Sequence, residues 1–115
     1  MNRPLARKVK KYIREHPRKF DMGIYYDKDE CGTTMCIAGT ACYLAGLAME
    51  DLAIGCGEGT FFGEARKLLG LNEEQANKLF YTEGWPSNLR DRYYTGLSKD
   101  AVKAAIARIN QVFGR

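Results

Sequence analysis

The feature that most constrains the fold is an apolar segment, Met35–Met49, which is broken only by Thr40 and two glycines. It is too short to cross a membrane, which takes about 18 apolar residues or more, so it predicts a helix buried in a protein core. Thr33 or Thr34 is expected to cap this helix, which would end near Ala48. Its many alanines and glycines leave little side-chain bulk, so we expect another helix to pack closely against it.

Apolar residues recur at helical spacing through much of the remaining chain. Asn2 is expected to cap a first helix that ends at His16, because the following proline pushes that residue out of the helical region. Asn72 and Gln75 have the spacing of a capping box. Four further helices are predicted, at residues 60–69, 73–80, 87–95 and from 98 towards the C-terminus.

Residues 18–32 are predicted to form a packed loop. Apolar residues alternate with others from Phe20 to Tyr26, as in a strand, but no second strand is evident that would pair with it. The predicted fold is therefore all-α: a compact bundle of five or six short helices around a central helix of small residues. Because 115 residues is near the commonest domain length, we expect residues 1–115 to form a single domain.

Charge is segregated along the chain. Residues 1–19 carry eight Lys or Arg and one Glu, a net charge of +7; residues 20–89 carry −7, and residues 90–115 carry +4. Two explanations stay open: the basic ends pack over the acidic middle, or they form a basic face for nucleic acid or an acidic partner. The nucleic-acid alternative depends on the basic residues of the first helix, namely Arg7, Lys8, Lys10, Lys11 and Arg14.

The basic N-terminus is not followed by an apolar stretch within the first twenty residues, so we expect no signal peptide and a cytoplasmic location. The four cysteines are then expected to be reduced. Four residues separate Cys31 from Cys36, and Cys36 and Cys42 point in different directions on a helix, which disfavours zinc. We therefore expect no metal, no cofactor and no membrane partner.

Cys31 and Cys36 flank the predicted start of the central helix and are the candidate nucleophiles. A helix N-terminus lowers the pKa of a nearby thiol, and His16, the only histidine, would act as the base if the fold brought it close. Asp21 is a further candidate for the same site. Two acidic residues precede Cys31 and would raise its pKa, whereas apolar residues follow Cys36 and suit a buried, inert thiol.

Several short motifs resemble a family of small bacterial and phage proteins. They are His16-Pro17, Phe20-Asp21-Met22, Cys31-Gly32-Thr33, Cys36-Ile37-Ala38-Gly39 and, further on, Trp85-Pro86. The resemblance covers about residues 13–110. It implies a bacterial or phage cytosol as the setting, and it implies no particular mechanism.

The small size, the segregated charge and the lack of an acid–base constellation predict a non-catalytic cytosolic protein. We expect it to bind another macromolecule, in the first place another protein, as an accessory factor of a phage or mobile element. Two alternatives stay open. One is a cysteine-dependent enzyme or thiol redox protein that uses Cys31 or Cys36 with His16. The other is a nucleic-acid-binding protein that uses its basic terminal helices.

Overall fold

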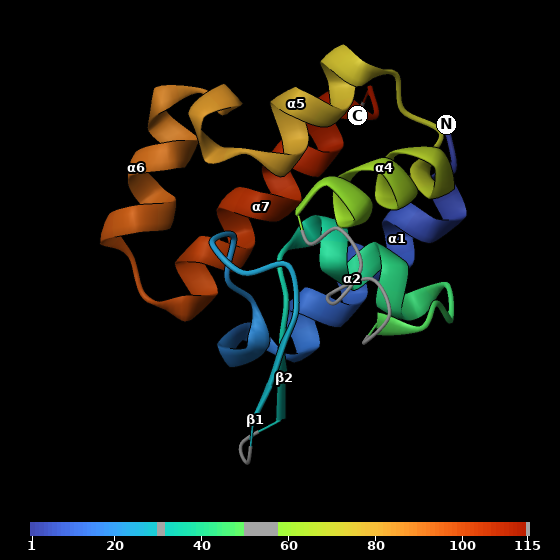
Figure 1. Cartoon of the computed structure of the whole chain (residues 1–115). Helices are drawn as coiled ribbons and strands as arrows, with labels where there is room; N and C mark the ends of the chain where they lie inside the picture. Colours follow the sequence, from blue (N-terminus) through green and yellow to red (C-terminus); the bar gives the residue numbers. More distant parts are fainter. Residues whose placement is uncertain (30–31, 50–57, 115) are drawn as a thin grey trace.

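The computed structural model describes residues 1–29, 32–49 and 58–114, and these ranges contain six α-helices (Figure 1). The all-α prediction is confirmed. The helices are α1 (Arg3–Glu15), α2 (Ile37–Leu44), α4 (Glu58–Leu69), α5 (Glu73–Phe80), α6 (Ser87–Thr95) and α7 (Ser98–Val112). The other described elements are the 3-10 turns η1 (Pro17–Lys19) and η2 (Thr82–Gly84) and the strands β1 (Asp27–Asp29) and β2 (Gly32–Thr34).

Helix α2 is the centre of the bundle, as its small residues predict. It packs against α1 and α4 and also touches α5. Every residue from Ile37 to Cys42 is buried, so this stretch of the helix has no face for solvent. The apolar stripe of α1 contributes Leu5, Ala6, Val9 and Ile13 to the same core. None of the helices in the described ranges is long and apolar enough to span a bilayer.

The start of α2 differs from the prediction. Cys36 is its N-cap, and the Cys36 sulfur accepts a hydrogen bond from the backbone N–H of Gly39 at 3.4 Å. Thr33 and Thr34 lie in β2 instead. The threonine cap was wrong because strand pairing holds both threonines in an extended conformation before the helix begins.

The loop predicted at residues 18–32 contains more structure than expected. Strands β1 and β2 pair in antiparallel fashion and extend away from the bundle (Figure 1). A parallel bridge between Phe20 and Met35 ties the start of the loop to the start of α2. The alternating residues from Phe20 to Tyr26 belong to neither strand. Strand β1 follows them and pairs with the threonines that the sequence predicts as a helix cap. Two strands of three residues each leave the all-α class unchanged.

The ends of several helices follow the predicted chemistry. Asn2 accepts a hydrogen bond from the Leu5 N–H at 3.1 Å, and Asn72 and Gln75 make both bonds of a capping box, at 2.8 and 2.9 Å. Gly70 ends α4 with a φ of 68°. These local signals needed no tertiary information.

Helix α2 ends earlier than predicted, at Leu44 instead of near Ala48. Gly46 follows it with a φ of 83°, a left-handed conformation that glycine adopts without strain. The second glycine of the apolar segment is therefore a stop signal.

The two chain termini lie close together (Figure 1). The backbone N–H of Asn2 donates to the Leu69 carbonyl at 2.8 Å, which fixes the start of α1 to the end of α4. The Arg3 guanidinium donates to the carbonyl of Phe113, just after α7. Helix α1 therefore lies against α7 along a seam that brings together the two basic ends of the sequence.

Candidate functional site

The described cysteines are poor nucleophiles. Burial raises the pKa of the Cys36 thiol to about 11, despite hydrogen bonds from backbone N–H groups at the start of α2 that act in the opposite direction. Burial likewise raises the pKa of Cys42 to about 12. A thiol that keeps its proton at neutral pH neither attacks nor exchanges readily. Cys31 lies outside the described residues, so its role stays a prediction.

We expect Cys36 to react with iodoacetamide at least about 100-fold more slowly in the native protein than in the unfolded chain at neutral pH. Its pKa rises from 9.0 to about 11, which lowers the thiolate fraction by that factor before steric shielding is added. Peptide mass spectrometry measures each cysteine separately, so Cys31 is scored in the same digest. Rapid labelling of native Cys36 would contradict the raised pKa of this thiol and favour the enzyme alternative.

His16 contacts its own helix. The Nδ1 of His16 lies 2.9 Å from the Tyr12 carbonyl oxygen, and its ring stacks on Tyr12 with centroids 4.3 Å apart. His16 therefore caps the last turn of α1. In the described part of the chain no hydrogen bond joins His16 to Asp21 or Cys36. Asp21 lies near Cys36, and its negative charge contributes to the raised pKa of that thiol.

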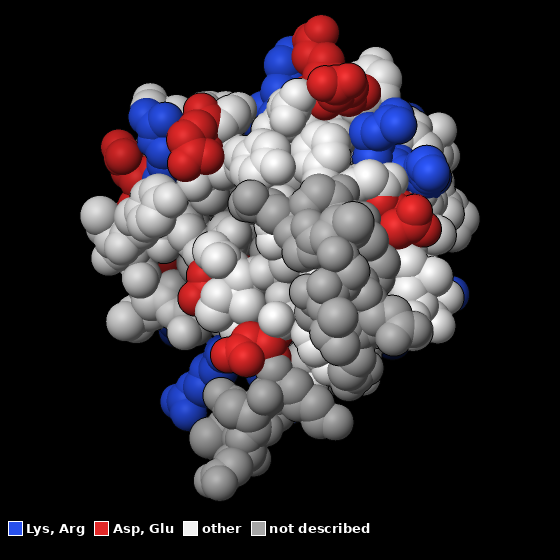
Figure 2. Space-filling view, in the orientation of Figure 1, with Lys and Arg blue, Asp and Glu red and all other residues white. Residues whose placement is uncertain are grey.

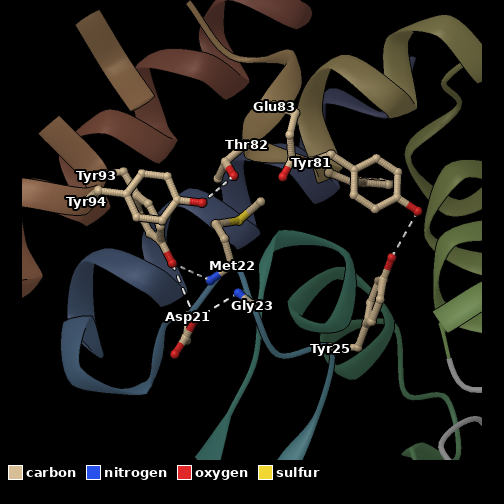
Figure 3. A pocket seen from close by; sticks show the side chains of 10 residues that line it. Asp21, Met22, Gly23, Tyr25, Tyr81, Thr82, Glu83, Tyr93 and Tyr94 are labelled. Carbon is tan, nitrogen blue, oxygen red and sulfur yellow. Dashed lines mark hydrogen bonds between the residues drawn. The ribbon is translucent and has the colours of Figure 1, made fainter. Parts of the chain in front are cut away.

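Asp21 instead helps to form a cavity of about 280 Å³ between the loop after η1, the turn η2 and helix α6 (Figure 3). Four tyrosines and two carboxylates contribute to its walls, and no Lys, Arg or His of the described residues does so. We call this cavity the tyrosine pocket; these six residues are Tyr25, Tyr81, Tyr93, Tyr94, Asp21 and Glu83. On the face drawn in Figure 2, charged side chains lie mainly near the margins of the described surface.

One wall of the pocket is a hydrogen-bonded unit around Tyr93. The Tyr93 hydroxyl accepts from the backbone N–H of Met22 at 2.8 Å and donates to Asp21 Oδ1 at 3.3 Å (Figure 3). The N–H of Gly23 donates to the same carboxylate oxygen at 2.8 Å. Burial raises the pKa of Tyr93 to about 12, and the charge of Asp21 adds to the effect. Tyr93 is therefore a neutral donor that fixes Asp21 at the pocket edge.

The other walls present aromatic rings with their hydroxyls paired. The hydroxyls of Tyr25 and Tyr81 lie 3.3 Å apart, and those of Thr82 and Tyr94 lie 2.7 Å apart. The rings of Tyr93 and Tyr94 meet edge to face with centroids 4.9 Å apart. Tyr94 is nevertheless 63% exposed, so part of its ring is free to contact a ligand.

Aromatic rings beside carboxylates suit a cationic ligand. The face of a tyrosine ring attracts an ammonium or guanidinium group, and a carboxylate adds a charge-assisted hydrogen bond. Within the described ranges, no group of three or more His, Cys, Asp and Glu side chains is placed to hold a metal ion. The chemistry of the lining residues therefore suits a cationic group.

Of the predicted site residues that the structure describes, the pocket contains only Asp21. Glu83, Tyr93 and Tyr94 were not predicted as site residues. The tyrosine pairs Tyr25-Tyr26 and Tyr93-Tyr94 are sequence signals that each contribute to this place. Neither pair indicates that the loop near Asp21 lies opposite α6.

Comparison of the chain with protein-family models, curated proteins and solved structures gives no match in any of the three. The resemblance to small bacterial and phage proteins therefore stays a prediction, and the function has to be inferred from the site alone.

Proposed function

We propose that this chain acts without catalysis, by binding a partner protein, and that the tyrosine pocket takes up a cationic side chain of that partner. The observation that carries the proposal is the pairing of two carboxylates, Asp21 and Glu83, with four tyrosine rings in a cavity that no described cation lines. An arginine or lysine side chain supplies the missing charge.

Aromatic and electrostatic contacts together contribute favourable free energy to the binding of a cation at this site. A cation over a ring contributes about 0.5–1 kcal/mol at an exposed site and about 2 kcal/mol when desolvated. Tyr93 holds Asp21 in place, so little ordering of that carboxylate is needed on binding. A preorganised carboxylate favours a guanidinium, which binds it through two parallel hydrogen bonds.

The surface beside the pocket favours a peptide segment over a free amino acid. A second hollow of about 380 Å³ continues from Tyr93 and Tyr94 towards the turn between α6 and α7. Leu97 stands at this turn and is 71% exposed. A partner peptide whose cationic side chain enters the pocket can place a neighbouring apolar residue against Leu97. This surface therefore favours a protein as the partner.

The proposal includes a cytoplasmic setting and an accessory role in a phage or mobile element. Cys36 and Cys42 are free thiols, which is the usual state of cysteines in a reducing compartment. The cysteine-dependent enzyme remains an alternative that depends on Cys31.

Trp85, the only tryptophan, makes the proposal testable without a known partner, because its ring lies 5.7 Å from that of Tyr93. Short capped peptides with a central arginine or lysine are titrated while Trp85 fluorescence is recorded. We expect saturation with millimolar or tighter affinity for the cationic peptides and much weaker binding of a norleucine peptide of similar length. Equal binding of the norleucine peptide, or no saturation with either cation, would overturn the proposal.

Variants locate the binding. Tyr94→Ala removes an exposed ring and is expected to weaken arginine-peptide binding about fivefold, whereas Tyr94→Phe keeps the ring and should bind nearly as the parent does. Glu83→Gln removes one carboxylate charge and should also weaken binding. Glu15→Gln, an exposed charge on α1 outside the pocket, is the matched control. An equal loss in Glu15→Gln would show a general charge effect and contradict a site at the pocket.

A further inference from the structure

Turn η2 carries two residues of the tyrosine pocket, Thr82 and Glu83, on a 3-10 helix of three residues. The Gly84 N–H donates to the Tyr81 carbonyl at 3.0 Å, which closes this single turn. Glu83 is exposed, and in Figure 3 it lies across the pocket from Asp21. A single turn with an exposed side chain depends on the rest of the protein for a fixed position.

Arg108 of α7 holds the backbone of this turn. Its Nη2 donates to the carbonyl of Gly84, the residue after Glu83, at 2.8 Å, and its Nε donates to the Lys78 carbonyl at 3.0 Å. Its Nη1 donates to Gln111 Oε1 at 2.9 Å, which fixes the guanidinium on its own helix. One half-buried side chain therefore forms a bridge between η2, α5 and α7.

The Lys78 carbonyl is a favourable place for this cation. It belongs to the last turn of α5, where carbonyls lack partners within the helix and the helix dipole attracts positive charge. Partial burial lowers the pKa of Arg108, because the charged guanidinium has lost part of its water shell. Hydrogen bonds from a charged donor are stronger than those between neutral groups. The Arg108 bridge is therefore expected to hold the turn firmly.

Close packing limits the movement of the turn on its other side. A Cβ built on Gly84 would lie 2.9 Å from the Asn77 carbonyl oxygen and 3.0 Å from the Lys78 Cα. The backbone of η2 therefore lies directly against the end of α5. Packing against α5 and hydrogen bonds from α7 together fix the position from which Glu83 extends.

We infer that Arg108 is a positioning residue of the tyrosine pocket, which holds Glu83 where a bound cation meets its carboxylate. None of the described lining residues comes from α7, so Arg108 acts through the backbone of η2. A carboxylate that is already in place loses little conformational freedom on binding and so contributes more to affinity. The inference rests on the proposed function for the nature of the ligand, and it adds a residue outside the pocket that sets the affinity.

Titration of the capped arginine peptide, followed by Trp85 fluorescence, separates positioning from long-range charge. Removal of a nearby cation by itself strengthens the attraction of the site for a positively charged peptide. Arg108→Ala is nevertheless expected to bind about three- to tenfold more weakly than the parent, because Glu83 is no longer held. Arg108→Lys keeps the charge but not the fork of donors, so it should also bind more weakly. Lys103→Ala removes an exposed cation from the same helix and is the control, which should not weaken binding.

A double-mutant cycle shows whether Arg108 acts through Glu83. In the Glu83→Gln background, Arg108→Ala should change the affinity by less than about twofold. An equal loss in both backgrounds would overturn the inference. So would tighter binding by Arg108→Ala, or an equal loss in Lys103→Ala.

Amide hydrogen exchange, followed by NMR, tests the bridge without any peptide. Exchange of the Gly84 N–H should become at least about tenfold faster in Arg108→Ala, whereas the amides of α1 should exchange as in the parent. Unchanged exchange at Gly84, or an equal increase in α1, would overturn the inference even if cationic peptides bind. Failure of the parent to bind any cationic peptide would instead overturn the proposed function, and the exchange rates would still decide whether Arg108 holds the turn.

Discussion

Gly39→Ala is expected to destabilise the protein by about 3 kcal/mol or more, a large loss for the addition of one methyl group. A Cβ built on Gly39 would lie 1.7 Å from the carbonyl oxygen of Tyr25 and 3.3 Å from the Cβ of Met35. The nearest atom belongs to the backbone, so the clash cannot be relieved by a change of rotamer. Urea unfolding followed by circular dichroism measures the loss.

Gly63→Ala is the matched control. Gly63 also lies inside a helix, α4, but nothing lies within 4 Å of a Cβ built there. Alanine is favoured over glycine in a helix interior by about 1 kcal/mol, so this variant should be neutral or more stable than the parent. The same intrinsic preference opposes the loss at Gly39, so a measured loss there is a lower bound on the cost of the clash. A neutral Gly39→Ala variant would contradict the close approach of the two segments.

Gly39 also shows what sequence reasoning achieves at the centre of this fold. The small residues of the apolar segment correctly predict that another backbone comes close. The expected neighbours were helices, and α1 and α4 do pack against α2. At Gly39 itself, however, the nearest atom is the Tyr25 carbonyl oxygen, which lies against the first turn of α2. Small side chains indicate the space available and not the element that fills it.

Helix ends with local chemistry were predictable, since the capping box at Asn72 and the stop at Gly70 depend only on residues near them in sequence. The start of α2 was not predictable in this way, because Thr33 and Thr34 pair with β1 as part of β2. A threonine before an apolar run fits a cap and a strand equally well, and pairing with residues 27–29 decides between them.

The tyrosine pocket could not be predicted, because its parts lie far apart in the chain. Asp21 was named from the sequence for a different reason, as a neighbour of the cysteines. Its actual partner, the Tyr93 hydroxyl, is 72 residues away. The packing of α6 against the rest of the bundle brings these groups together. A local sequence pattern does not indicate contacts between residues so far apart in the chain.

The segregated charge of the sequence is only partly mixed by the fold. The acidic middle contributes Asp21 and Glu83 to the tyrosine pocket. The basic ends meet along the α1–α7 seam, because Arg3 and Phe113 connect the termini.

Trp85→Ala is expected to cost about 3–5 kcal/mol, the usual range for removing a buried tryptophan. Trp85 is 3% exposed, and its Nε1–H donates to the Leu79 carbonyl at 2.9 Å, near the end of α5. Its ring also supports Tyr93, edge to face at 5.7 Å. The substitution therefore loosens the link between α5 and α6 and removes the backing of the tyrosine pocket.

Trp85→Phe separates these contributions. It keeps an aromatic ring beside Tyr93 but loses the donor to Leu79, so we expect a smaller cost of about 1–3 kcal/mol, that of an unsatisfied carbonyl. Circular dichroism in urea measures both variants, because neither retains a tryptophan to report unfolding. If Trp85→Ala cost less than about 1 kcal/mol, the indole would not be the buried link that its contacts indicate. If the two variants cost the same, the hydrogen bond to Leu79, and not the ring, would carry the stability, and the Trp85 ring would not be needed to hold Tyr93.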